Sequence, residues 1–326
     1  MEKVKLYFSE KYFDVEPHLD ATGEKKYFLD ETIKPKWIRD ALLNLNLSIR
    51  LVEPEKLAWD DLLLVHTEDY ITAVLRGKPE ELASSSGFRW GRRLFRSQLY
   101  TNGGVYSASK TALRDSVSGT LSGGFHHATK NRGAGFCVFN GIAIAIKKLQ
   151  NEGLIEKALV FDCDAHFGDG TFDIFAGDNS ISIVDLFRYV QQKGSSPPNH
   201  TENGVFTQVS NAKVYLEEIK KLPLYLRKFR PDVVIYNAGM DVYEGDRLGG
   251  IPGVTEDILR GRDSFVFKTC RNLGIPVTFA LGGAYAKHKD KKGDMLPSEK
   301  IKEGREKIVD LYISLIKSAT DTFYTK

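Results

Sequence analysis

Four short and mostly apolar runs, rich in β-branched residues, constrain the fold of this chain more than any other feature of its sequence. They span residues 158–163, 181–186, 232–238 and 276–281. Runs of this length and composition are typical of strands buried on both faces of a sheet. Helical patterns lie before, between or after them, at 140–151, 214–229, 255–273 and 298–318. Strands that alternate with helices predict βαβ units, and therefore an α/β fold with a central, mostly parallel sheet flanked by helices.

Composition narrows the classes of function. The formal net charge of the 326 residues is +3, which argues against a general nucleic-acid-binding protein. No apolar run approaches the ~18 residues that suggest a membrane-spanning helix, so no membrane span is expected. The N-terminus lacks the apolar core of a secretory signal, and the three cysteines (137, 163 and 270) lie far apart. A cytoplasmic location is therefore expected.

Two polar segments, 78–96 and 191–205, are predicted to be long loops. Loops of this length in a compact domain often carry functional residues, so both are candidate rims of a site; the alternative is that each is an ordinary surface loop. We interpret the arginine cluster at 89–96 as a solvated face rather than a nucleic-acid patch, because no base-stacking aromatic motif surrounds it.

Acidic and imidazole side chains gather where two of the predicted strands end. Asp162, Asp164 and His166 alternate, so an extended chain points all three the same way. Asp241 follows another strand, and the carboxyl ends of parallel strands meet at one edge of a sheet, where ligands bind. Asp164, His166 and Asp241 could therefore converge on a metal ion; Zn²⁺ suits this donor set and Fe²⁺ would also fit. Three protein ligands leave an open position, as in catalytic sites, while a capped strand end is the alternative.

Two further motifs carry polar groups beside paired glycines. His126 and His127 follow the glycines at 123–124. Paired imidazoles can transfer protons when carboxylates orient them, but this pair could equally bind metal or be structural. Tyr285 follows the glycines at 282–283, which would let the backbone crowd a site and present the tyrosine hydroxyl. On its own, a tyrosine after such a turn is more often structural.

In combination, five motifs resemble those of the histone deacetylase family. In chain order they are GGFHHA (123–128), GFCVFN (135–140), DCDAHFGDGT (162–171), NAGMDVYEGDRLGG (237–250) and GGAY (282–285). The resemblance runs from about residue 64 to residue 285. The string YNAGMDVYEGDRLGG and the aspartate of IVDLF are most similar to class IV, the histone deacetylase 11-like branch. The resemblance implies the arginase/deacetylase fold, with a single catalytic domain over residues 1–326.

The resemblance also implies a role for each matching residue. The implied Zn²⁺ ligands are Asp164, His166 and Asp241. The implied catalytic groups are two histidine–carboxylate pairs and a tyrosine that polarises the substrate carbonyl: His126 with Asp162, His127 with Asp169, and Tyr285. The implied walls of a narrow substrate tunnel are Gly135, Phe136 and Gly283. A structural K⁺ or Na⁺ ion is implied at Asp162, Asp164, His166, Asp185 and Leu186. We expect His127 to act as general base and then general acid, and His126 to stay protonated.

The implied activity is that of a zinc-dependent amidohydrolase that removes acetyl or longer acyl groups from the side-chain amine of lysine. The partner is then an acylated lysine peptide or protein, or another acylated amine. One alternative is a small-molecule deacetylase of the same fold that acts on acetylpolyamine-like substrates, and another is a non-catalytic acyl-lysine-binding protein. An arginase-like enzyme would need two Mn²⁺ ions and more carboxylates, whereas Phe167 and Gly168 follow His166. No counterpart of the rim aspartate found in some members is seen within 78–96.

Overall fold

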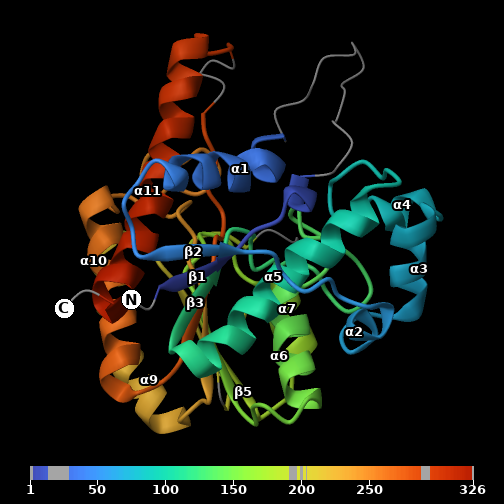
Figure 1. Ribbon diagram of the computed structural model, residues 1–326, viewed down its shortest axis with the longest axis horizontal. Coiled ribbons are helices and arrows are strands. Elements are labelled where there is room, and N and C mark those ends of the chain that lie inside the picture. The colour runs from blue at the N-terminus through green and yellow to red at the C-terminus, as the bar shows by residue number, and fades with distance from the viewer. Residues whose placement is uncertain are drawn as a thin grey trace.

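The described strands pair in parallel to form one eight-stranded sheet (Figure 1). The computed structural model describes residues 3–13, 29–190, 197–198, 201–202, 204–287 and 294–324. In chain order the strands are β1 Val4–Tyr7, β2 Ile49–Val52, β3 Val117–Thr120, β4 Ala158–Asp162, β5 Ile181–Phe187, β6 Gly204–Gln208, β7 Val233–Asn237 and β8 Val277–Ala280. Across the sheet their order is β2-β1-β3-β8-β7-β4-β5-β6. The predicted α/β fold with a parallel sheet is therefore confirmed.

Helices cover both faces of this sheet. In the described part of the chain they are η1 Glu10–Phe13, α1 Leu29–Leu43, α2 Trp59–Leu63, α3 Glu68–Arg76, α4 Glu80–Ala83, α5 Leu94–Asp115, α6 Gly141–Asn151, α7 Asp169–Phe175, α8 Ala212–Ile219, α9 Leu222–Phe229, α10 Glu256–Leu273 and α11 Ser298–Tyr324. Figure 1 shows α9, α10 and α11 on one side of the sheet and α5 and α6 on the other. No helix among the described residues is long and apolar enough to cross a membrane.

The alternation of side chains along each strand explains the two layers. Leu159 and Phe161 of β4 are fully buried in a core that includes residues of α8 to α11. Val160, between them, is buried in a second core with residues of α5, α6 and α7. Because successive strand residues point to opposite faces, a strand covered on both sides must be apolar at every position. This requirement produces the continuous apolar runs in the sequence.

The four predicted strands are present as β4, β5, β7 and β8, whereas β1, β2, β3 and β6 were not predicted. The helix expected at 255–273 also forms: the Thr255 side chain accepts a hydrogen bond from the Ile258 amide, and Gly274 ends the helix with φ of +67°. The left-handed conformation at Gly274 is one that glycine adopts at little cost.

Two predictions about secondary structure were wrong in part. Residues 214–229 are not one helix, because α8 ends at Ile219 and α9 begins at Leu222. Pro223 stands in the first turn of α9, where a missing N–H costs nothing, but it could not continue α8. Segment 78–96 is not a continuous loop, because it contains α4 and the start of α5. The predicted loop at 191–205 falls largely outside the described residues.

The register of the central strands aligns their carboxyl ends. Asp162 at the end of β4 lies opposite Asn237 of β7 on one side and Asp185 of β5 on the other. Asn237 in turn lies opposite Ala280 of β8. The loops that leave β4, β7 and β8 therefore start side by side, and they carry Asp164, His166, Asp241 and Tyr285 of the candidate site.

Candidate metal centre and active site

Asp164, His166 and Asp241 meet at the carboxyl edge of the sheet. One potential ligand atom of each lies within 4.8 Å of the others, and all three side chains are buried. His166 Nδ1 is 2.9 Å from Asp241 Oδ2 and 3.1 Å from Asp164 Oδ1. The structure thus brings together the three side chains that the strand ends had indicated as a possible metal cluster.

Glycines allow the loops to approach this closely. A Cβ atom on Gly239 would lie 2.5 Å from Asp164 Cα, and one on Gly283 would lie 2.5 Å from Asp241 Oδ2. The backbone also fixes both carboxylates: Gly283 N–H donates to Asp164 Oδ2 at 2.6 Å, and Ala165 N–H donates to Asp241 Oδ1 at 2.9 Å. The carboxylates are therefore held in place by three strand-end loops.

The three side chains compensate one another's charge. Burial alone lowers the pKa of His166, but hydrogen bonds and charges from Asp164 and Asp241 raise that pKa to about 11. Burial and the Asp164 charge raise the pKa of Asp241 to about 7. Burial would also raise the pKa of Asp164, but the charge of His126 and the hydrogen bond from His166 hold it well below its usual value.

This donor set fits a divalent cation. Buried carboxylates need a compensating positive charge, and the protonated His166 supplies it together with the charged His126. A metal ion that displaces this proton would receive two carboxylate oxygens and one imidazole nitrogen, which suit Zn²⁺ or Fe²⁺. No cysteine takes part; Cys163, Cys137 and Cys270 are buried free thiols.

Two buried histidine–aspartate pairs stand beside this cluster, as the resemblance implied. His126 Nδ1 is 2.8 Å from Asp162 Oδ2, and His127 Nδ1 is 2.7 Å from Asp169 Oδ1. The two imidazole rings lie 4.1 Å apart, and both line the same cavity. Each pair has the geometry in which a carboxylate fixes the orientation of an imidazole.

The pKa values of the two histidines move in opposite directions. Burial alone lowers the pKa of His126, but the negative charges of Asp162 and Asp164 raise it to about 10. Burial and the neighbouring charge of His126 lower the pKa of His127, although Asp169 opposes them. At neutral pH, His126 is therefore charged, whereas His127 is neutral and can accept a proton.

Asp185 lies behind the cluster, where the resemblance implied a monovalent cation. Its Oδ2 accepts a hydrogen bond from Gly168 N–H at 2.8 Å, while Oδ1 is buried without a hydrogen-bond partner among the described residues. Burial and the charge of Asp162 raise the pKa of Asp185 well above its usual value. A buried, unsatisfied carboxylate oxygen of this kind fits a K⁺ or Na⁺ ion, with the Leu186 backbone beside it.

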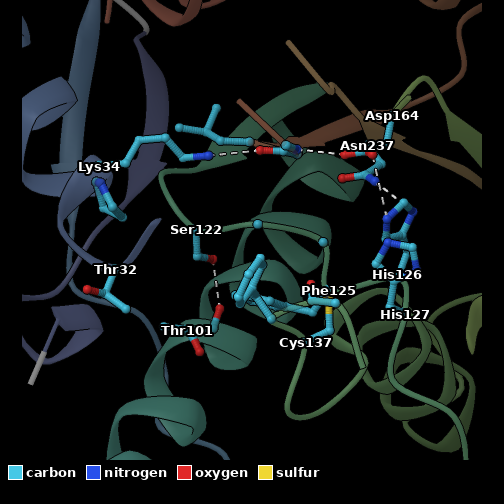
Figure 2. Close-up of a pocket in the computed structure, with 18 of the residues that line it drawn as sticks. Thr32, Lys34, Thr101, Ser122, Phe125, His126, His127, Cys137, Asp164 and Asn237 are labelled. Atoms are coloured by element: carbon cyan, nitrogen blue, oxygen red, sulfur yellow. Dashed lines mark hydrogen bonds and ion pairs between the residues drawn. The ribbon is translucent and has the colours of Figure 1, made fainter. Parts of the chain in front are cut away.

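A cavity of about 830 Å³, which includes some open solvent, reaches Asp164 and both histidines. Phe136 and Phe88 line it with their rings 5.7 Å apart, and Gly135, Gly283 and Tyr285 complete this part of the wall. Gly135 and Phe136 have φ of +52° and +63°, and such a conformation is unusual for phenylalanine. Figure 2 shows the cavity continuing from the histidines toward Lys34, Thr101 and Ser122.

Hydrogen bonds between its own backbone and the loop at 246–247 hold Tyr285 in place. Its N–H donates to Asp246 Oδ2 at 2.6 Å, and its carbonyl accepts from Arg247 N–H at 3.1 Å. Its ring lies 6.3 Å from the His166 ring at an angle of 88°. Asp246 belongs to the motif at 237–250, but no role was predicted for it.

Two other residues near the site were missed. Tyr189 is the second residue after β5, and its ring lies 6.0 Å from the His166 ring; its position after a strand end was a usable signal. Arg262, on α10, is fully buried and donates to the carbonyl of Gly239 at 2.7 Å, which ties the loop that carries Asp241. Asp263 pairs with this guanidinium at 2.9 Å. Nothing in the local sequence distinguishes Arg262 from a solvent-exposed helical arginine.

Comparison with known proteins gives the family. A model of the histone deacetylase domain matches residues 32–293, so the chain belongs to the histone deacetylase family. An uncharacterized protein from Picosynechococcus is 33% identical over 71% of this chain and 76% of its own length. A probable deacetylase from Methanothermobacter thermautotrophicus is 30% identical over 75% of this chain and 77% of its own. Histone deacetylase 2 from Arabidopsis thaliana is 29% identical over 73% and 64%, respectively.

Solved structures share the fold. The HD domain of HDA15 has a TM-score of 0.72 at 20% identity, covering 99% of this chain and 95% of that domain. An acetylpolyamine aminohydrolase from Burkholderia pseudomallei also has a TM-score of 0.72, at 16% identity, with coverage of 96% and 98%. At these identities the likeness establishes the architecture, while the chemistry must be argued from the side chains.

Proposed function

We propose that the protein is a zinc-dependent deacylase that hydrolyses the side-chain amide of acylated lysine, removing acetyl or longer acyl groups. One observation carries the proposal: a buried three-ligand cluster, flanked by two histidine–aspartate pairs, lies beside a cavity with aromatic walls. Membership of the histone deacetylase family supports the same type of reaction. When bound by Asp164, His166 and Asp241, Zn²⁺ would supply Lewis acidity toward the amide oxygen and lower the pKa of the hydrolytic water.

His127, His126 and Tyr285 would carry out the proton transfers and stabilise the charge that develops during hydrolysis. His127, neutral at neutral pH, takes a proton from the attacking water and delivers it to the departing amine. His126, charged beside Asp162, stabilises developing negative charge. The Tyr285 hydroxyl donates a hydrogen bond to the amide oxygen as it becomes an oxyanion. The acylated side chain reaches these groups along the part of the cavity wall that Phe136, Gly135 and Gly283 line.

Several finer assignments belong to the same proposal. The motif at 237–250 and Asp185 support placement in class IV, the histone deacetylase 11-like branch. The unsatisfied Oδ1 atom of Asp185 supports a structural K⁺ or Na⁺ ion held with Asp162, Asp164, His166 and Leu186. The family model spans most of the chain, which supports one catalytic domain over residues 1–326. The small number of cysteines supports a cytoplasmic location.

The second candidate is a small-molecule deacetylase. It is favoured by the similarity in fold to an acetylpolyamine aminohydrolase. A non-catalytic acyl-lysine-binding protein is disfavoured, because the chain retains the three ligand candidates, both histidine–aspartate pairs and Tyr285.

A substrate panel tests these alternatives. One preparation of the zinc-loaded protein is incubated with acyl-lysine peptides from acetyl to long-chain acyl, and with acetylpolyamines, and the released amine is measured. His127→Ala is the matched inactive control, and a hydroxamate should inhibit the wild type. We expect one metal ion per chain at the catalytic cluster and release from at least one acyl-lysine peptide. Release from acetylpolyamines alone would support the second candidate, and no release from any substrate would support a binding protein.

A further inference from the structure

Basic residues outnumber acidic ones around the mouth of the cavity. Five described segments form part of this border: 84–93, 129–136, 188–190, 246–249 and 284–287. Each contributes a residue to the cavity wall or contacts a residue of the candidate site. Together they contain eight basic residues and one acidic residue: Arg89, Arg92, Arg93, Lys130, Arg132, Arg188, Arg247 and Lys287, against Asp246. We call these eight side chains the basic rim; the whole chain, by contrast, has a net charge of only +3.

The one acidic residue of these five segments is turned inward. Asp246 accepts hydrogen bonds from three backbone N–H groups, those of Tyr285, Leu248 and Gly249, at 2.6, 2.8 and 3.0 Å. Its carboxylate is therefore committed to the loop and does not face a ligand at the mouth. Elsewhere, Asp173 accepts from the Lys130 N–H at 3.4 Å and offsets part of the positive charge there. The five segments therefore carry a formal excess of basic residues, eight against one.

Contacts of two members of the rim connect them to the candidate site through Tyr189 and Tyr285. The Arg188 guanidinium lies 4.9 Å from the centre of the Tyr189 ring, which in turn lies 6.0 Å from the His166 ring. Arg247 is exposed, and its N–H donates to the carbonyl of Tyr285. These two arginines come from the loops that follow two different strands, β5 and β7. In physiological salt, exposed charges interact appreciably over about one Debye length. The two arginines can therefore act on a ligand that binds at the mouth of the cavity.

We propose that the basic rim selects substrates in which acidic residues flank the acylated lysine. This inference rests on the proposed function and names its substrate class. An acylated lysine is itself neutral, so the flanking residues of the peptide decide the sign of its attraction to the mouth. Lysine- and arginine-rich tails are repelled, and so are acetylpolyamines, which retain cationic amines. After hydrolysis the new ammonium group faces the same cations, which favours release of the product.

Three peptides with one acyl-lysine and identical length test the proposal. Their flanking residues are two aspartates, two alanines or two lysines, and kcat/KM is measured for each at low and at physiological salt. We expect the acidic peptide to exceed the basic one by roughly 10-fold to 100-fold at low salt, because each nearby pair of charges contributes a few-fold. The ratio should shrink as salt screens the rim.

Charge-reversal variants test whether residues of the basic rim cause the preference for acidic peptides. The double variant Arg188→Glu and Arg247→Glu should invert the preference, whereas Arg227→Glu should preserve it. Arg227 is an exposed residue of α9, which contributes no residue to the cavity wall. Equal kcat/KM for the three peptides, or an acidic preference that survives the double variant, would overturn the inference while leaving the proposed function standing. Failure to hydrolyse even the alanine-flanked peptide would overturn both.

Discussion

Replacing Gly283 with alanine should disrupt the metal site without unfolding the protein. The new Cβ atom would lie 2.5 Å from Asp241 Oδ2 and 2.9 Å from Asp164 Oδ2, whereas ordinary contacts begin near 3.4 Å. Asp241 would have to retreat by about 0.9 Å, which is the difference between 3.4 and 2.5 Å. Metal–ligand distances tolerate only about ±0.2 Å. The substitution should therefore displace a ligand well beyond what a metal centre accepts.

The surroundings leave little room for relief. Gly283 is tied on both sides: its carbonyl accepts from the N–H groups of Met240 and Asp241 at 2.8 and 2.9 Å, and its own N–H donates to Asp164. Asp241 is fully buried and accepts from Ala165 N–H. Changes to groups that orient metal ligands typically cost ~10-fold to 100-fold in affinity. We expect a loss of about 100-fold or more here, because the ligand itself is pushed.

The assay is competition for Zn²⁺ against a chelating dye, together with urea denaturation of the metal-free protein. Overpacking of this kind costs ~1–3 kcal/mol of the free energy of unfolding, against a usual total of ~5–15 kcal/mol, so the variant should remain folded. The matched control is Gly261→Ala, because Gly261 lies in α10 and, among the described residues outside its own helix backbone, no atom lies within 4 Å of the added Cβ. It should bind Zn²⁺ normally and gain ~0.5–1 kcal/mol in stability. Zinc affinity of Gly283→Ala within threefold of wild type would refute the reasoning.

Three further predictions concern the chemistry of the site. Tyr285→Phe should keep its bound zinc but lose ~2.7–4 kcal/mol of transition-state stabilisation; turnover close to wild type would exclude the role of the hydroxyl. Asp169→Asn should move the acid limb of the kcat/KM profile to lower pH, because the carboxylate raises the pKa of His127 and its removal lets that pKa fall further; a shift to higher pH would contradict this. Zinc affinity should fall about tenfold per pH unit between pH 9 and 7, because the ion must displace the proton of His166, whose pKa is about 11 in the metal-free protein. Below pH 7 the fall should steepen, because Asp241, with a pKa of about 7, then takes up a second proton; titrations at several pH values would test the slope.

The parts of the molecule that could be predicted from the sequence are those that local physics dictates. Strands β4, β5, β7 and β8 are buried on both faces, so their burial leaves continuous apolar runs in the chain. The side chains that follow a parallel strand are forced to one edge of the sheet, and this rule was enough to bring Asp164 and His166 together with Asp241. The edge strand β2 (IRLV) is different, because it is only partly buried and carries an arginine. Its pairing with β1 places Val4 opposite Ile49. These residues are far apart in the sequence, so no local pattern predicts the pairing.

Arg262 shows why supporting residues escape prediction. It stands in the charged stretch LRGRD of α10, a composition that favours an exposed helix face. In the structure its guanidinium is buried and donates to the Gly239 carbonyl, to the Tyr215 hydroxyl and to Asp263. The position of α10 against β7 decides this burial, and Asp263 makes it tolerable by compensating the charge. Neither condition can be recognised before the helix has been placed on the sheet.

The protonation states of the two histidines likewise depend on surroundings that only the folded structure provides. His126 and His127 are adjacent in sequence, and each has one aspartate partner at nearly the same distance, 2.8 and 2.7 Å. Their pKa values nevertheless diverge, because His126 Nε2 also lies 3.8 Å from Asp164 Oδ1, whose charge adds to that of Asp162. Once His126 is charged, its proximity disfavours a second positive charge on His127. Asp162 together with Asp164, a member of the metal cluster, thus favours the proton on His126 and leaves His127 free to act as a base.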